Sequence, residues 1–210
     1  MEVRAVILDF GGVLCFHPSE ERFARIARLL NVSALKLLEI FWAYRIDYDA
    51  GRLTAREYWG RVADDAGHGL DDDLLRTLMR YEVELWDNYD RRVFGWAAHL
   101  KSKGIRTGVL SNLPPSLGEA LLKTPGLLDP FDHLTFSYQL KVVKPDPAIY
   151  HDAADGLAVP PGQALFLDDR PDNVEGARAI GMQAELYTTW EAFLDEAAGR
   201  YKLPMLLQSP

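Results

Sequence analysis

The feature that most constrains this chain is a series of short apolar runs separated by segments of helical character. The runs are rich in β-branched and large apolar residues, as buried strands are, and they end at turns or polar residues. They cover Val3–Phe10, Ile105–Leu110, Leu134–Ser137, Ala164–Leu167 and, more weakly, Gln183–Tyr187. Helices are expected between the later runs, at Arg92–Lys103, Pro147–Asp155 and Asp172–Ile180. The alternation predicts an α/β fold, a Rossmann-like parallel sheet with helices on both faces.

The stretch from His17 to Asn88 breaks this alternation, because it contains no convincing strand. Four helices are expected there, near Glu20–Leu30, Ala34–Tyr44, Ala55–Ala66 and Asp72–Trp86. We therefore expect an α/β core formed by residues 1–16 and 89–210, and an all-helical domain formed by residues 17–88. Open α/β sheets bind ligands at the carboxyl ends of their strands, so a helical insertion after the first strand is expected to act as a cap.

Composition excludes several classes of protein. Among 210 residues, 23 Lys and Arg face 31 Asp and Glu, and the formal net charge is −8. Such a chain is poorly suited to bind nucleic acid or an anionic membrane, both of which require clustered cations. The single cysteine, Cys15, excludes an intramolecular disulfide and a multi-cysteine zinc site, and it is consistent with a reducing cytoplasm. We expect a cytoplasmic protein that is a monomer or a homodimer.

Four polar signals follow four of the apolar runs. Each has an ordinary structural explanation, such as a turn-forming acid or a solvated lysine. Because the carboxyl ends of parallel strands meet at one sheet edge, the four together predict one site there. The signals are Asp9 before Gly11 and Gly12, then Ser111-Asn112, then Lys144-Pro145, then Asp168-Asp169 with Asn173.

The pair Asp168-Asp169 indicates a metal. Two adjacent carboxylates at the end of an apolar strand repel each other unless a cation lies between them. Hard divalent cations prefer such oxygen ligands, and Mg²⁺ is the simplest choice.

The four signals, in this order and at these separations, resemble the haloacid dehalogenase-like (HAD) hydrolase superfamily. The helical insertion resembles the cap of the subgroup that includes glucose-1-phosphate phosphatases and the phosphatase domain of soluble epoxide hydrolase. The stretch from Gly51 to Trp59 also resembles that subgroup's cap. The resemblance implies a Mg²⁺-dependent phosphatase acting on a small phosphorylated metabolite, with a sugar phosphate favoured.

The resemblance also implies a role for each residue. Asp9 would be the nucleophile that forms an aspartyl-phosphate, and Lys144 would balance the charge on Asp9 and on the phosphoryl group. Ser111, Asn112 and Lys144 would bind phosphoryl oxygens. Asn173 would brace the loop that carries Asp169. Mg²⁺ would be held by Asp9, the backbone carbonyl of Gly11, Asp169 and, through water, Asp168.

One position departs from the pattern. Phosphatases of this superfamily usually carry a second Asp, a general acid and base worth ~10²–10⁴-fold in rate, where this chain has Gly11. A substitute could come from His17, Asp47 or Asp49; a good leaving group could need less help; or the protein could be a weak or inactive binding protein. A 2-haloacid dehalogenase is a further alternative, which the pair Asp168-Asp169 disfavours.

The helical insertion is expected to supply substrate specificity. His17, Trp42 and Arg45 are the candidates, with a salt bridge to Asp47, Asp49 or another acid as the alternative for Arg45. Other aromatic residues of the insertion, including Trp86, are expected to be divided between core and site. Cys15 is expected to be a buried apolar residue, and the apolar tail Leu203–Leu207 to fold back or to pack against a partner subunit.

Overall fold

The computed structural model describes residues 2–195 and 199–205. Five parallel strands form one sheet in the order β3-β2-β1-β4-β5, which confirms the predicted α/β fold. The expected strands are all present, with ends shifted by a few residues. They are β1 (Ala5–Leu8), β2 (Arg106–Ser111), β3 (His133–Phe136), β4 (Ala164–Asp168) and β5 (Gln183–Leu186).

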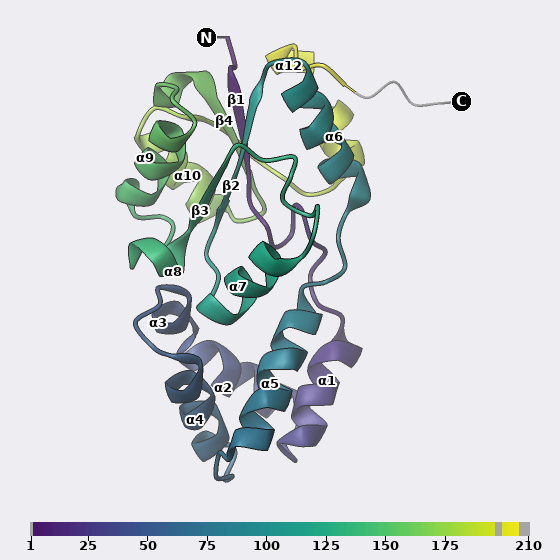
Figure 1. The fold of residues 1–210 in the computed structure, drawn as a ribbon, viewed down its shortest axis with the longest axis vertical. Coiled ribbons are helices and arrows are strands. Elements are labelled where there is room, and N and C mark those ends of the chain that lie inside the picture. Colours follow the sequence, from purple (N-terminus) through teal and green to yellow (C-terminus); the bar gives the residue numbers. More distant parts are fainter. Residues whose placement is uncertain (1, 196–198, 206–210) are drawn as a thin grey trace, which may run out of the picture.

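Helices cover both faces of the sheet (Figure 1). In β1, Val6 and Leu8 pack with α6 and α7 on one face, while Ala5 and Ile7 pack with α9 and α10 on the other. All four residues are fully buried, which explains why β1 reads as a continuous apolar run. The helices around the sheet are α6 (Arg91–Ser102), α7 (Pro115–Lys123), α8 (Ser137–Leu140), α9 (Pro147–Gly156), α10 (Pro171–Ala179), α11 (Trp190–Phe193) and α12 (Gly199–Tyr201).

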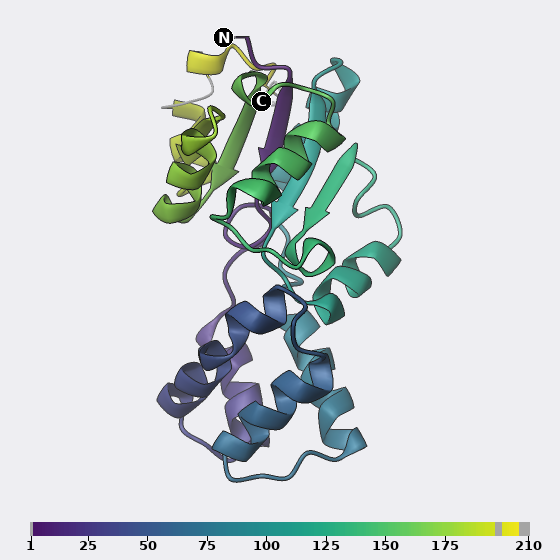
Figure 2. The same ribbon diagram turned by 90° about the vertical axis from the view of Figure 1, so that its left-hand side faces the viewer.

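The expected helical insertion forms a separate bundle with its own apolar core, centred on Phe41, Tyr58 and Trp59. We call residues 20–85 the helical block. Figure 2 shows it beyond the end of the sheet to which the strand arrows point. Its helices are α1 (Glu20–Leu29), α2 (Ala34–Ala43), α3 (Arg45–Asp49), α4 (Ala55–Asp65) and α5 (Asp72–Leu85). Only α3 is unexpected, because five residues are too few to show a helical period.

Polar contacts hold the helical block against the sheet. The hydroxyl of Ser137 donates to the backbone oxygen of Asp49 at 2.5 Å, and Nζ of Lys141 donates to the backbone oxygen of Gly51 at 2.6 Å. Both acceptors lie at or just after α3, so this short helix is fixed close to the strand ends.

The apolar tail folds back as far as the structure describes it. Leu203 is buried in the same core as α6, and Nε1 of Trp96 donates to the backbone oxygen of Pro204 at 3.0 Å. The last two residues of this predicted feature, Leu206 and Leu207, lie outside the described residues. In the described part of the chain, no helix is long and apolar enough to cross a membrane.

Candidate active site

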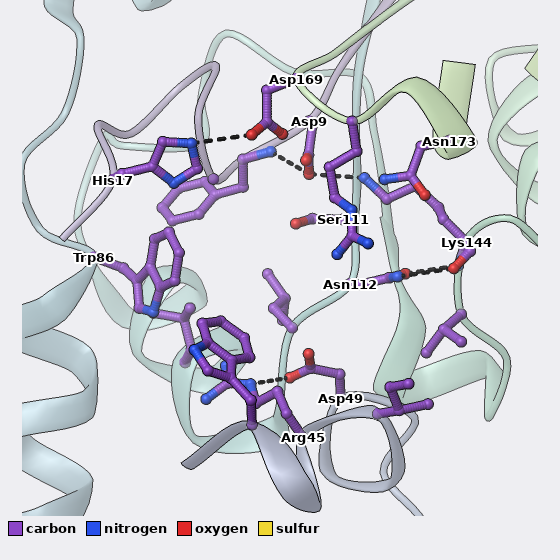
Figure 3. Close-up of a pocket in the computed structure, with 18 of the residues that line it drawn as sticks. Asp9, His17, Arg45, Asp49, Trp86, Ser111, Asn112, Lys144, Asp169 and Asn173 are labelled. Atoms are coloured by element: carbon purple, nitrogen blue, oxygen red, sulfur yellow. Dashed lines mark hydrogen bonds and ion pairs between the residues drawn. The ribbon is translucent and has the colours of Figure 1, made fainter. Parts of the chain in front are cut away.

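A pocket of about 650 Å³ lies between the carboxyl ends of the strands and the helical block (Figure 3). The structure brings the predicted site residues together around it, although they come from both parts of the chain. The predicted residues that line it are Asp9, Gly11, His17, Trp42, Arg45, Ser111, Asn112, Lys144, Asp169 and Asn173. Asp168 is fully buried behind them.

The turn after β1 places Asp9 beside Asp169. The backbone N–H of Asp9 still donates to Leu167 of β4 at 2.9 Å, and the chain then turns sharply. Gly12 has φ +78°, and a Cβ atom there would lie 2.6 Å from Cγ of Asp169. A glycine is therefore required both by the left-handed backbone and by the close approach of the Asp169 carboxylate.

Lys144 is the central cation of the site. Its Nζ lies 2.9 Å from Oδ1 of Asp9 and 2.6 Å from Oδ2 of Asp168, and it also donates to the backbone oxygen of Leu110 at 3.1 Å. Burial lowers the pKa of Lys144, but the two carboxylates more than offset it, so the pKa is raised. Lys144 therefore remains an ammonium ion that holds both carboxylates.

The carboxylates outnumber this cation. Oxygen atoms of Asp9, Asp168 and Asp169 lie within 4.8 Å of one another. The pKa of Asp9 is raised to about 7: burial is the largest cause, Lys144 opposes the rise, and the charges of Asp168 and Asp169 add to it. Three clustered carboxylates with one lysine leave an excess of negative charge, and their oxygen donors suit a hard divalent cation. The residues present therefore fit Mg²⁺.

Asp168 is held rigidly from behind. Its Oδ1 accepts from the backbone N–H of Arg170 at 2.8 Å, and Nδ2 of Asn173 lies 3.0 Å and 3.1 Å from its two oxygens. With Lys144 as a further partner, Asp168 is well placed to orient its neighbours. Asn173 thus contacts Asp168, the residue that precedes Asp169.

Asn112 positions the backbone of Lys144. Its Nδ2 donates to the Lys144 carbonyl at 3.2 Å, and its Oδ1 accepts from the Lys144 N–H at 2.8 Å. This reciprocal pair leaves one amide N–H of the Asn112 side chain for the predicted phosphate contact. Ser111, the last residue of β2, is buried and lines the pocket beside it.

Trp86 covers the position of the absent acid. A Cβ atom at Gly11 would lie 2.9 Å from Cζ3 and 3.4 Å from Cη2 of the Trp86 ring. Trp86 follows α5 and lines the pocket, as expected for part of the aromatic set. Its packing on Gly11 carried no sequence signal, because the two residues are far apart in the chain.

Of the three candidate substitutes for that acid, His17 and Asp49 line the pocket and Asp47 does not. Nε2 of His17 lies 3.0 Å from Oδ2 of Asp169, and this hydrogen bond raises the pKa of His17. Asp49 also lines the pocket. Asp47 was a wrong expectation: it is exposed, pairs with Arg52 at 2.8 Å and does not line the pocket. Its side chain lies on the outer surface because it extends from a different face of α3 than Asp49 does.

Arg45 is buried rather than at the surface. Its Nε lies 2.7 Å from Asp49 Oδ1, and its Nη1 lies 2.7 Å from Glu82 Oε1. Sequence reasoning missed Glu82, which is fully buried on α5 with Leu78 and Leu85. Its spacing is the sequence signal that could have revealed it. Glu82 lies four residues after Leu78 and three before Leu85, which places all three on the same buried face of α5.

The sequence is similar to proteins of one hydrolase family. A family model described as haloacid dehalogenase-like hydrolase matches residues 3–181. The chain is 40% identical over 185 residues to a phosphoglycolate phosphatase of Rhodospirillum rubrum, covering 85% of this chain and 77% of the relative. It is 31% identical over 187 residues to (S)-2-haloacid dehalogenase 1 of Pseudomonas sp. strain CBS-3, covering 85% of this chain and 82% of that relative. It is 34% identical over 205 residues to bifunctional epoxide hydrolase 2 of Mus musculus, but the match spans 87% of this chain and 36% of that protein.

Solved structures share the fold. A HAD-like hydrolase from Porphyromonas gingivalis superposes with a TM-score of 0.79 at 21% identity, covering 97% of this chain and 100% of that chain. A HAD family enzyme from Bacteroides thetaiotaomicron, crystallised as a magnesium complex, gives a TM-score of 0.78 at 17% identity. The match covers 93% of this chain and 100% of that chain.

Proposed function

The chain belongs to the haloacid dehalogenase-like hydrolases, and from that premise we propose that it is a Mg²⁺-dependent phosphatase of a small phosphorylated metabolite, with a sugar phosphate favoured. The observation that carries the proposal is the cluster of Asp9, Asp168 and Asp169 around Lys144. The 40% identity to a phosphoglycolate phosphatase supports the reaction class.

Asp9 is the nucleophile of the proposed reaction. One of its carboxylate oxygens attacks phosphorus, the bond from phosphorus to the leaving oxygen breaks, and that oxygen keeps the electron pair and takes up a proton. The product is an aspartyl-phosphate. Water then attacks phosphorus, which releases inorganic phosphate and restores the Asp9 carboxylate. Lys144, 2.9 Å from Asp9, stabilises the negative charge in both steps.

The remaining residues bind and orient the substrate. Ser111, Asn112 and Lys144 hold phosphoryl oxygens, while Asn173 keeps Asp168 in place. Asp9, Asp169 and the carbonyl of Gly11 hold Mg²⁺, with Asp168 acting through water. The bound cation would reduce the repulsion between the anionic nucleophile and the anionic substrate. Residues 17–88 act as a cap over the core of residues 1–16 and 89–210.

A second candidate function is phosphate-ester binding with little turnover. The packing of Trp86 on Gly11 favours it, because the ring occupies the space of the usual acid and base. A dehalogenase has a relative in its favour, but such chemistry has no use for the carboxylate pair Asp168-Asp169 that the chain holds beside Lys144.

Phosphate release tests these alternatives directly. Wild type, Asp9→Asn and the exposed control Asp47→Asn would be given p-nitrophenyl phosphate and sugar phosphates, with Mg²⁺ and with EDTA. A phosphatase releases phosphate in wild type and Asp47→Asn, only with Mg²⁺, and loses at least ~10³-fold in Asp9→Asn. Thermal stabilisation by the esters without turnover would establish a binding protein instead. Halide release from a 2-haloacid in EDTA would establish a dehalogenase.

A further inference from the structure

The wall of the pocket that faces the strand ends is built by α2 and α3. Figure 3 shows Arg45 and Asp49 on the opposite side of the pocket from Asp9 and Asp169. Trp42 and Ile46 line the same wall. A phosphoryl group bound at Asp9 would therefore direct the rest of the substrate toward these four residues, which we call the helical wall.

Arg45 offers no free charge to a ligand at this wall. Its Nε and Nη1 are each 2.7 Å from a carboxylate, one of Asp49 and one of Glu82. Only 5% of its side chain is exposed, and its guanidinium lies 5.1 Å from the centre of the Phe41 ring. The cation is therefore neutralised and packed between its partners.

Contacts across the block fix this arrangement. The second carboxylate oxygen of Glu82 accepts from the hydroxyl of Ser116 at 2.6 Å and from that of Tyr48 at 3.2 Å. Ser116 belongs to α7 of the sheet core, so the carboxylate that holds Arg45 is itself anchored from the other part of the chain. Turning Arg45 toward the pocket would leave Glu82 buried without its cation, which is strongly unfavourable.

Asp49 is the polar group that the helical wall presents. Its side chain is 13% exposed and lines the pocket, whereas Glu82 is completely buried. An aspartate has about four acceptor positions, and the ion pair with Arg45 is made through Oδ1, which leaves acceptor positions for a substrate hydroxyl. Whether Asp49 is ionised or protonated, the group of Arg45, Asp49 and Glu82 carries no net positive charge.

We propose that the helical wall selects an uncharged, hydroxyl-bearing leaving group and disfavours one that carries a carboxylate, with Asp49 as the specificity-determining residue. Asp49 accepts a hydrogen bond from a substrate hydroxyl, while a carboxylate at that place finds no free cation and, once Asp49 is ionised, meets like charge. The other arginine that lines the pocket, Arg170, directly follows Asp169 and precedes α10, so it comes from the sheet core and not from the helical wall. This inference rests on the proposed phosphatase activity.

A matched pair of esters tests the proposal. In 2-hydroxyethyl phosphate a hydroxymethyl group stands where 2-phosphoglycolate carries its carboxylate. We expect wild type to have a kcat/KM at least about tenfold higher for 2-hydroxyethyl phosphate. Asp49→Asn keeps the shape but cannot ionise, so at about pH 8, where wild-type Asp49 is negatively charged, it should move the ratio toward 2-phosphoglycolate by about tenfold. Asp47→Asn, on the same helix but outside the pocket, should leave the ratio unchanged.

p-Nitrophenyl phosphate, which carries neither a hydroxyl nor a carboxylate on its leaving group, distinguishes a failure of the phosphatase activity from a failure of the specificity. If wild type hydrolyses none of the three esters, the proposed phosphatase activity fails. If it hydrolyses p-nitrophenyl phosphate but prefers 2-phosphoglycolate, the activity stands and the specificity proposal is overturned. An unchanged ratio in folded Asp49→Asn would equally overturn the role of Asp49. The wild-type ratio needs no variant, so a failure of Asp49→Asn to fold leaves the proposal testable.

Discussion

The ring of Trp86 lies directly over Gly11, so that a Cβ atom at position 11 would come within 2.9 Å of Cζ3. The resemblance to HAD phosphatases implies an acid at position 11, and here an aromatic ring from the end of the helical block fills the space. The glycine is therefore matched to the tryptophan, and replacing the glycine alone would not restore an acid in a working position.

The first prediction concerns this pair. Gly11→Asp alone should destabilise the protein by about 1–3 kcal/mol, because the new side chain collides with a packed ring. Gly11→Asp combined with Trp86→Ala should provide both the acid and its space. We expect the double variant to turn over esters with poor leaving groups at least about tenfold faster than Trp86→Ala alone.

Thermal unfolding and steady-state rates measure the two effects. A Gly11→Asp variant as stable as wild type would show that the ring moves aside freely. Equal rates in Trp86→Ala and in the double variant would show that an acid at position 11 is not what limits turnover.

The second prediction concerns metal binding without any turnover. Mg²⁺ that binds only the folded state should raise the free energy of unfolding, by about 2.7 kcal/mol at 100 times its Kd. Asp169→Asn should lose this stabilisation because it removes one of the clustered carboxylates. Asp172→Asn, which also lines the pocket but lies outside the cluster, serves as the control. Equal Mg²⁺-dependent shifts in melting temperature for all three proteins would exclude the predicted site.

The third prediction concerns the pH dependence of stability. The pKa of Asp49 is raised from 3.8 to about 7: burial is the largest cause, Arg45 opposes the rise, and the charge of Glu82 adds to it. The charge of the Asp49 carboxylate also acts on the buried phenol of Tyr58, whose pKa it helps to raise. Between about pH 4 and about pH 7, Asp49 keeps its proton in the folded state and releases it in the unfolded state. The contribution of Asp49 to the free energy of unfolding therefore falls as the pH rises through this range. The loss is on the order of 4 kcal/mol.

Asp49→Asn removes that titration. Unfolding free energies measured at about pH 5 and about pH 8 should therefore differ less in Asp49→Asn than in wild type. The exposed variant Asp47→Asn should keep the wild-type difference, since Asp47 is paired only at the surface. A pH dependence of the same size in all three proteins would contradict the raised pKa.

The fourth prediction concerns Cys15. The side chain is buried, and burial raises the pKa of its thiol to about 12. Because the thiolate is the reactive form, iodoacetamide should label native protein at least about 100-fold more slowly than urea-unfolded protein. Mass spectrometry of the labelled chain gives both rates, and fast labelling of the native protein would show that the turn after β1 opens readily.

Much of the fold was predictable because its signals are local. Each strand is a short apolar run, and the polar residues that follow the runs meet at one edge because parallel strands align their ends. That rule was sufficient to bring Asp9, Ser111 and Lys144 into one pocket from a single sequence. The helical block was visible for the same reason, since its four longer helices show a clear period.

The rest depended on packing between distant segments. The five-residue helix α3 has no readable period, and its geometry decides that Asp49 faces the pocket while Asp47 faces solvent. The partnership of Arg45 with Glu82 joins positions on two helices, and the contact of Trp86 with Gly11 joins the block to the sheet. Such contacts are set by tertiary structure, which a single sequence does not display.

In the proposed reaction, Asp9 carries the phosphoryl group during turnover. Without an acid and base at position 11, water attack on the aspartyl-phosphate receives less help, so the intermediate should accumulate with a good leaving group. The measurement is the mass of the peptide that contains Asp9 after acid quench during turnover of p-nitrophenyl phosphate. We predict a gain of one phosphoryl group on Asp9, present with Mg²⁺ and absent with EDTA. Steady hydrolysis with Asp9 unmodified, and at an equal rate in Asp9→Asn, would show that Asp9 is not the nucleophile.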